Sequence, residues 1–247
     1  YLMWNPERME AVRPRRADFP SPPFWRRLGS TGRRVVAVDV PFVFPPEPFE
    51  GVELNGWATH DRLGPPSAHP TALLDEVERE FGPPPLEEEV HRPLAVDRLL
   101  AIRDELVRAT DAVTGVAESL ARREAWDLLL TGYSATHRGG HKLWVDPVSP
   151  PPDDAEGREL RTALRDVYVA IDRGIGRLVE AAGPDTAVLV FALHGMGPNS
   201  CHTQILGEMV RRILAGDDGS EATRSRSMSV LQTLRGMLPL SLRNEVK

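Results

Sequence analysis

The sequence contains almost no cysteine: Cys201 is the single one among 247 residues. One thiol cannot form an internal disulfide, which excludes a disulfide-stapled scaffold. Apolar runs of the roughly 18 to 20 residues that a membrane-spanning helix needs are also missing. The start shows no basic segment followed by an apolar one, so the sequence predicts no secretory signal and a cytoplasmic protein.

An excess of positive charge is lacking as well. Lys and Arg number 30 against 36 Asp and Glu, which gives a formal net charge of −6. A protein that binds nucleic acid in a basic groove usually has a clustered positive surface, so this class is not expected. Hydrophobic residues make up 41% and charged residues 27%, and both values are ordinary for a globular chain.

Hydrophobic patterning predicts one α/β domain over residues 1–247, and the 23 Pro and 20 Gly indicate long loops. Buried strands are expected at 35–40, 126–133 and 186–193, and helices at 24–28, 94–123, 156–182 and 203–215. Strands that alternate with helices favour a mostly parallel sheet flanked by helices. The Pro-rich segment 41–70 and the helical segment 70–124 together predict an insertion at 41–124.

Histidines follow two of the expected strands. His137 and His141 come after the strand at 126–133, and His194 comes after the strand at 186–193. Ligands of open parallel sheets bind beyond the carboxyl ends of the strands, and neutral imidazole is a common ligand of transition metals. The three histidines are therefore candidate metal ligands, although loop histidines bonded to backbone or water would give the same pattern.

The spacing of His137 and His141 suits one face of a helix, but Gly139 and Gly140 favour a tight loop that folds both rings inward. Other candidates are weaker. Ser134 and Thr136 are expected to end the strand, and the remaining histidines and the cysteine are expected to be incidental: His60, His69, His91, His202 and Cys201.

At these residues the sequence resembles a known family. Residues 193–199, Leu-His-Gly-Met-Gly-Pro-Asn, are similar to the Asp-His-Gly-Met segment of the alkaline phosphatase superfamily. The similarity is narrower to its type I phosphodiesterase/nucleotide pyrophosphatase branch and the predicted phosphohydrolase/phosphomutase relatives of that branch. Residues 23–37, 136–141 and 168–175 also resemble segments of these relatives.

The resemblance implies an alkaline-phosphatase-like fold with two divalent ions, zinc or manganese, at the carboxyl edge of the sheet. It implies that a Ser or Thr attacks a small phosphate ester and forms a covalent phospho-enzyme, which a metal-activated water then hydrolyses. His141 matches a ligand of the first ion and His194 a ligand of the second.

Two positions depart from the family pattern, because His137 and Leu193 stand where the family has Asp. No match is found for the family's early Asp, its nucleophile or its last His, so the catalytic residues are unassigned. We therefore expect an internal fragment whose nucleophile lies outside this chain.

Three hypotheses follow from the resemblance. The first is a metal-dependent phosphoric ester hydrolase that acts on mono- or diesters. The second is a non-catalytic relative whose degenerate metal site serves a binding or scaffold role, which Leu193 favours. The third is transfer of a phosphate or sulfate group to an acceptor other than water, which uses the same motifs.

Overall fold

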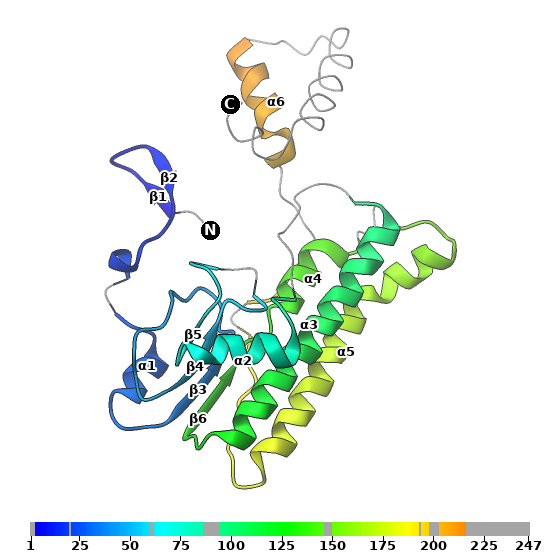
Figure 1. Ribbon diagram of the computed structural model, residues 1–247. Helices are drawn as coiled ribbons and strands as arrows, with labels where there is room; N and C mark the ends of the chain where they lie inside the picture. The colour runs from blue at the N-terminus through cyan, green and yellow to red at the C-terminus, as the bar shows by residue number, and fades with distance from the viewer. Residues whose placement is uncertain are drawn as a thin grey trace. The chain divides into compact units, whose positions relative to one another are not determined.

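The structure, a computed structural model, describes residues 3–19, 21–59, 62–85, 94–145, 150–192, 194–197 and 203–215. The chain divides into two compact units, Tyr1–Pro198 and Asn199–Lys247. The first unit contains the sheet, and the second contains helix α6 (Thr203–Ala215), at the residues that the sequence predicts (Figure 1). None of the helices in the described ranges combines the length and the apolar character needed to cross a bilayer.

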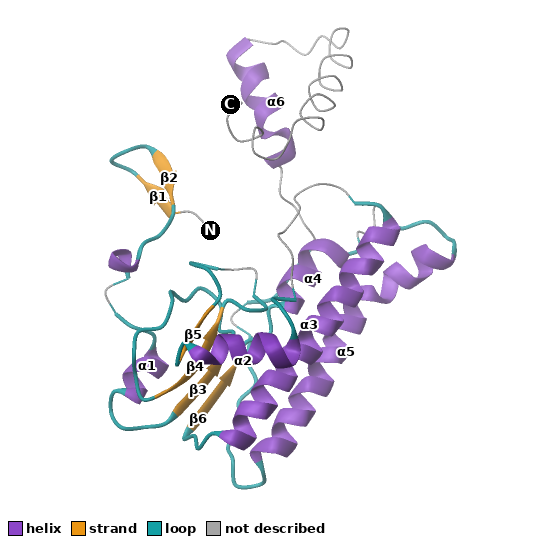
Figure 2. Cartoon of the chain, in the orientation of Figure 1, coloured by secondary structure: helices purple, strands orange, loops and turns teal. Residues whose placement is uncertain are grey.

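The central feature of the first unit is a four-stranded sheet (Figure 2). Its order is β5 (Ser67–His69), β4 (Gly51–Asn55), β3 (Val35–Val38) and β6 (Leu128–Thr131). β3 runs parallel to both β4 and β6, whereas β5 is antiparallel to β4. The α/β class with a mostly parallel sheet is therefore confirmed.

Strand β3 is the centre of the core because all four of its residues are apolar and buried. Val36 and Val38 face helices α2 (Ala72–Phe81) and α3 (Val96–Arg123). Val35 and Ala37 face the opposite side, where they cluster with Trp25 of helix α1 (Phe24–Gly29). A strand covered on both faces is typical of a parallel sheet and explains the continuous apolar run.

Helices α3, α4 (Ala135–Leu143) and α5 (Ala155–Ala182) pack into a second cluster beside the sheet. The side chain of Asp154 caps the start of α5 by accepting a hydrogen bond from the Gly157 N–H at 2.8 Å. Gly183, with φ +80°, ends the helix. The helices expected at 94–123 and 156–182 are thus confirmed to within about two residues, because their apolar stripes are long and regular.

The structure adds elements that the sequence analysis missed. β4 and β5 lie within the Pro-rich segment 41–70, for which no strand was expected, and α2 is a separate helix at the start of the segment 70–124, which was expected to be helical. A short hairpin, β1 (Met3–Asn5) with β2 (Glu10–Val12), and the 3-10 turn Arg16–Asp18 occupy the expected lead-in. Prolines lie in the loops between these elements and not within them. The Pro-rich composition therefore indicates the connecting loops.

The prediction of a strand at 186–193 is wrong for the residues of this segment that the structure describes. Residues 187–192 form no strand, and Val188, Leu189, Val190 and Phe191 are 53–81% exposed. Their composition suits a buried strand, but a strand also needs a hydrogen-bonded neighbour. β6 ends the sheet order of the described residues, so nothing there pairs with this segment.

A buried ion pair joins α1 to β4. Arg26 donates from Nε and Nη2 to the two carboxylate oxygens of Glu53, at 2.8 and 2.6 Å, and both side chains are at most 4% exposed. Trp25 donates from Nε1 to the same carboxylate at 3.2 Å. This network fixes α1 against the sheet, because separating either charge from its partner would leave the other one buried and unpaired.

Replacing Gly174 by Ala should destabilise the first unit. A Cβ there would lie 2.5 Å from Thr114 Oγ1 and 2.9 Å from the Tyr133 hydroxyl, where α3 and α5 meet. We expect the free energy of unfolding in urea to fall by about 1–3 kcal/mol, the usual cost of overpacking. Gly176→Ala, on the same helix with open space around it, is the matched control and should be neutral or slightly stabilising. Equal effects of the two substitutions on the free energy of unfolding would contradict close packing of α3 against α5 at Gly174.

Candidate functional site

The parallel strands bring three loops to one edge of the sheet. Asp39 follows β3 directly, Trp57 to Thr59 follow β4, and Ser134 follows β6. Ser134 Oγ donates to Thr59 Oγ1 at 2.7 Å, which ties the loop after β6 to the loop after β4. This edge is where ligands of open parallel sheets bind.

Asp39 anchors the loops of this edge. Its side chain is buried, its φ is +56°, and its carboxylate accepts hydrogen bonds from the backbone N–H groups of Trp57 at 2.8 Å and Ala58 at 2.5 Å. Burial raises the pKa of Asp39 to about 6, against the lowering effect of the two backbone hydrogen bonds and of the positive charge of Arg62. Sequence reasoning does not identify Asp39, because an acid near the end of an apolar run is common and its burial depends on the fold.

His137 and His141 lie on helix α4, which corrects the tight loop that Gly139 and Gly140 suggested. Their Nε2 atoms are 3.1 Å apart, and the ring centroids are 4.6 Å apart. The glycines serve packing instead. A Cβ on Gly139 would lie 3.2 Å from Leu164, and one on Gly140 would lie 2.8 Å from Met196. Close packing of α4 therefore outweighs the poor helix propensity of glycine.

His194 reaches the same place from a distant part of the chain. Its ring centroid is 5.6 Å from that of His137, with an angle of 70° between the ring planes. Its Nδ1 lies 3.3 Å from the carbonyl oxygen of Gly195, and Met196 packs against Gly140. Imidazoles from two separate segments thus lie together at the carboxyl edge of the sheet.

The geometry of this histidine cluster can be compared with that of a metal site. Two imidazole nitrogens on one tetrahedral zinc ion, each at about 2.0–2.1 Å, are separated by about 3.3 Å. The 3.1 Å between Nε2 of His137 and Nε2 of His141 fits this arrangement. Within the described ranges, however, no three His, Cys, Asp or Glu side chains are grouped as a metal site. Among the described residues, the histidine pair has the spacing for one ion, and no second group of ligands is present there for another.

The weaker candidates add nothing to this cluster. His69 Nε2 lies 3.1 Å from the carbonyl oxygen of Phe49, and its ring packs against the Phe49 ring, so it has a structural role. Five other residues that the sequence singled out lie outside the described residues: His60, His91, Leu193, Cys201 and His202.

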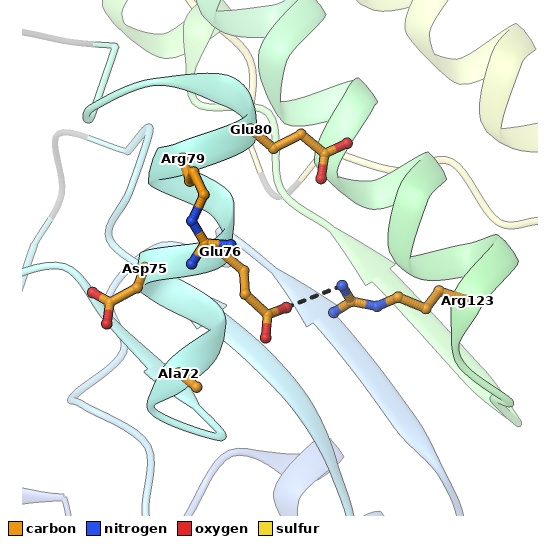
Figure 3. Close-up of a pocket in the computed structure, with 6 residues that line it drawn as sticks. All are labelled: Ala72, Asp75, Glu76, Arg79, Glu80 and Arg123. Atoms are coloured by element: carbon orange, nitrogen blue, oxygen red, sulfur yellow. Dashed lines mark hydrogen bonds and ion pairs between the residues drawn. The ribbon is translucent and has the colours of Figure 1, made fainter.

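A surface depression between α2 and the end of α3 is an unsuitable alternative (Figure 3). It has a volume of about 540 Å³ and is lined by charges of both signs, with Glu76 and Arg123 paired across it at 3.1 Å. Arg123 ends α3 shortly before β6 begins. The depression is therefore near the amino end of that strand, whereas the histidine cluster follows its carboxyl end.

Comparison with known families agrees with this fold. The chain belongs to the family described as Type I phosphodiesterase / nucleotide pyrophosphatase, whose model matches residues 1–230. Its members hydrolyse phosphodiester and pyrophosphate bonds, so the family indicates a phosphoric ester hydrolase. No curated protein and no solved structure matches the chain.

The raised pKa of Asp39 predicts a pH-dependent stability. The neutral carboxyl is favoured in the folded state, so its contribution is fully present below the unfolded value of 3.8 and is lost as the pH rises through about 6. Two pKa units correspond to about 3 kcal/mol. Urea unfolding at pH 4 and pH 7 should show Asp39→Asn, which is always neutral, becoming more stable relative to the wild type by about this amount at the higher pH. If the free energies of unfolding of Asp39→Asn and the wild type changed equally between pH 4 and pH 7, burial would not raise the pKa of Asp39.

Proposed function

We propose that this protein hydrolyses phosphate mono- or diesters with a divalent ion held by His137, His141 and His194. The observation that carries the proposal is the Nε2 to Nε2 distance of 3.1 Å, which leaves the two imidazoles of α4 placed for one ion. His194, with its ring 5.6 Å from that of His137, is the third ligand once its Nδ1 or Nε2 turns toward the pair.

Zinc or manganese at this position would neutralise charge on the phosphoryl group and lower the pKa of a bound water. The chain itself positions the histidine side chains that would hold the ion. α4 fixes the His137 and His141 rings four residues apart on one face, and the contact of Met196 with Gly140 places the His194 segment beside them. The Asp39 carboxylate and the bond between Ser134 and Thr59 hold the surrounding loops.

The reaction that we propose passes through a covalent phospho-enzyme, as the family resemblance implies, followed by hydrolysis. A nucleophile is not assigned to any residue of this chain. Ser134 is a poor candidate because its hydroxyl proton is donated to Thr59 within the scaffold. The substrate is expected to be a small phosphate ester, because a chain with a formal net charge of −6 does not favour a nucleic acid bound in a basic groove.

A non-catalytic binding role is the second candidate. It is favoured by the lack of a third ligand in metal-binding position among the described residues and by Leu193, which stands in the place of a family carboxylate. This alternative predicts that the protein contains no stoichiometric metal and turns over no phosphate ester.

Metal content and hydrolysis should depend on the histidine pair. We expect the wild type to retain about one zinc or manganese per chain, measured by elemental analysis, and to hydrolyse bis-p-nitrophenyl phosphate or p-nitrophenyl phosphate. His141→Ala should lose the metal and lower hydrolysis by at least 100-fold, because His137 is then left with His194 alone, whose ring must first turn toward the ion.

His69→Gln is the matched control, because this histidine interacts only with Phe49 among the contacts described above. It should keep both the metal and the activity. Hydrolysis that persists in metal-free His141→Ala would exclude the proposed mechanism, and a metal-free, inactive wild type would favour the binding role.

A further inference from the structure

Arg138 carries a buried positive charge for which the described residues provide no ion-pair partner. It lies on α4 directly after His137 and is 2% exposed. Its Nε and Nη1 atoms are buried and make no hydrogen bond. In the described part of the chain, no carboxylate forms an ion pair with it, although such pairs are common there.

Arg26 shows how the same chain satisfies a buried guanidinium. Arg26 is 5% exposed, and its Nε and Nη2 donate to Glu53 while Nη2 also donates to the Phe44 carbonyl oxygen. Arg138 is equally buried but has neither a carboxylate nor a carbonyl acceptor for Nε and Nη1. Arg26 leaves only Nη1 without a hydrogen bond and keeps its ion pair with Glu53, whereas Arg138 leaves both Nε and Nη1 without one.

The chemistry of the guanidinium defines what is missing. Arginine is always charged in proteins and only donates hydrogen bonds, so the missing partner is an acceptor with negative charge. Neighbouring guanidinium N–H groups match two oxygens of one carboxylate or phosphate.

The position of Arg138 selects between these anions. α4 starts at the carboxyl edge of the sheet, and no side chain caps its first turn. Free backbone N–H groups at a helix start attract anions, and Arg138 lies in this part of the helix, between the two histidines of the pair. A phosphoryl group is the anion that the proposed function would bring to this part of the helix.

We propose that Arg138 binds the phosphoryl oxygens of the substrate beside the His137 and His141 pair. The identity of the ligand as a phosphate ester rests on the proposed function. Arg138 is then the residue that selects an anionic phosphoryl group at this edge, and the unpaired Nε and Nη1 atoms are its binding groups.

Binding of inorganic phosphate tests this proposal separately from catalysis. Calorimetric titration and thermal unfolding would be measured with phosphate, and with chloride at equal ionic strength, on zinc-loaded protein and on protein in chelator. We expect Arg138→Met to weaken phosphate binding at least tenfold in the zinc-loaded protein. Arg138→Lys, which keeps the charge but loses the planar pair of donors, should be intermediate. Arg165→Met, which removes a 73% exposed guanidinium from α5, is the matched control and should bind phosphate as the wild type does.

Stability without phosphate separates binding from a structural role. Loss of an uncompensated buried charge should leave the melting temperature of Arg138→Met unchanged or higher. A lower melting temperature with unchanged phosphate affinity would make Arg138 structural and overturn the proposal, as would zinc-loaded wild type that binds no phosphate.

The two proposals can fail independently. If the wild type hydrolyses esters and Arg138→Met keeps the same kcat and KM, the role of Arg138 is wrong and the hydrolase stands. If the wild type binds phosphate through Arg138 but hydrolyses no ester, the hydrolase is wrong and the phosphate site stands.

Discussion

The parallel pairing of β3 with β4 and β6 is the constraint on which the first unit depends. β3 can occupy the centre only because both of its faces are covered, by α1 on one side and by α2 and α3 on the other. Once the three strands run in the same direction, the loops that follow them meet at one edge. Asp39 secures the loop after β4, and Ser134 secures the start of α4. The sheet therefore positions His137 and His141 through α4, whereas the contact of Met196 with Gly140 positions the His194 segment.

The sequence predicts those elements whose signal is contained in their own residues. α3 and α5 each carry a long apolar stripe, and β3 is a continuous apolar run, so periodicity identifies all three. β4 contains the buried Glu53 and Asn55, which interrupt its apolar pattern and are satisfied only by distant partners, Arg26 and the backbone of the loop after β3. Residues 187–192 show the converse error, because a strand-like composition cannot supply the neighbouring strand.

The candidate site is predictable to a similar extent. Histidines after strands can be found in a sequence, and the structure brings His137, His141 and His194 together, while their role as metal ligands stays a prediction. Asp39 and Arg138 could not be found in this way. An acid at a strand end and an arginine in a helix are common, and both become unusual only through burial and through the presence or absence of partners. Burial and the presence of partners depend on tertiary packing, which cannot be read from a single sequence.

The exposed apolar residues 188–191 also favour association between molecules in concentrated solution. The outer margin of β6 presents backbone groups without a neighbouring strand in the described residues, and the run presents aliphatic and aromatic side chains to water. Both kinds of surface are templates for cross-molecular β association and aggregation. We therefore expect self-association of the protein to increase with its concentration.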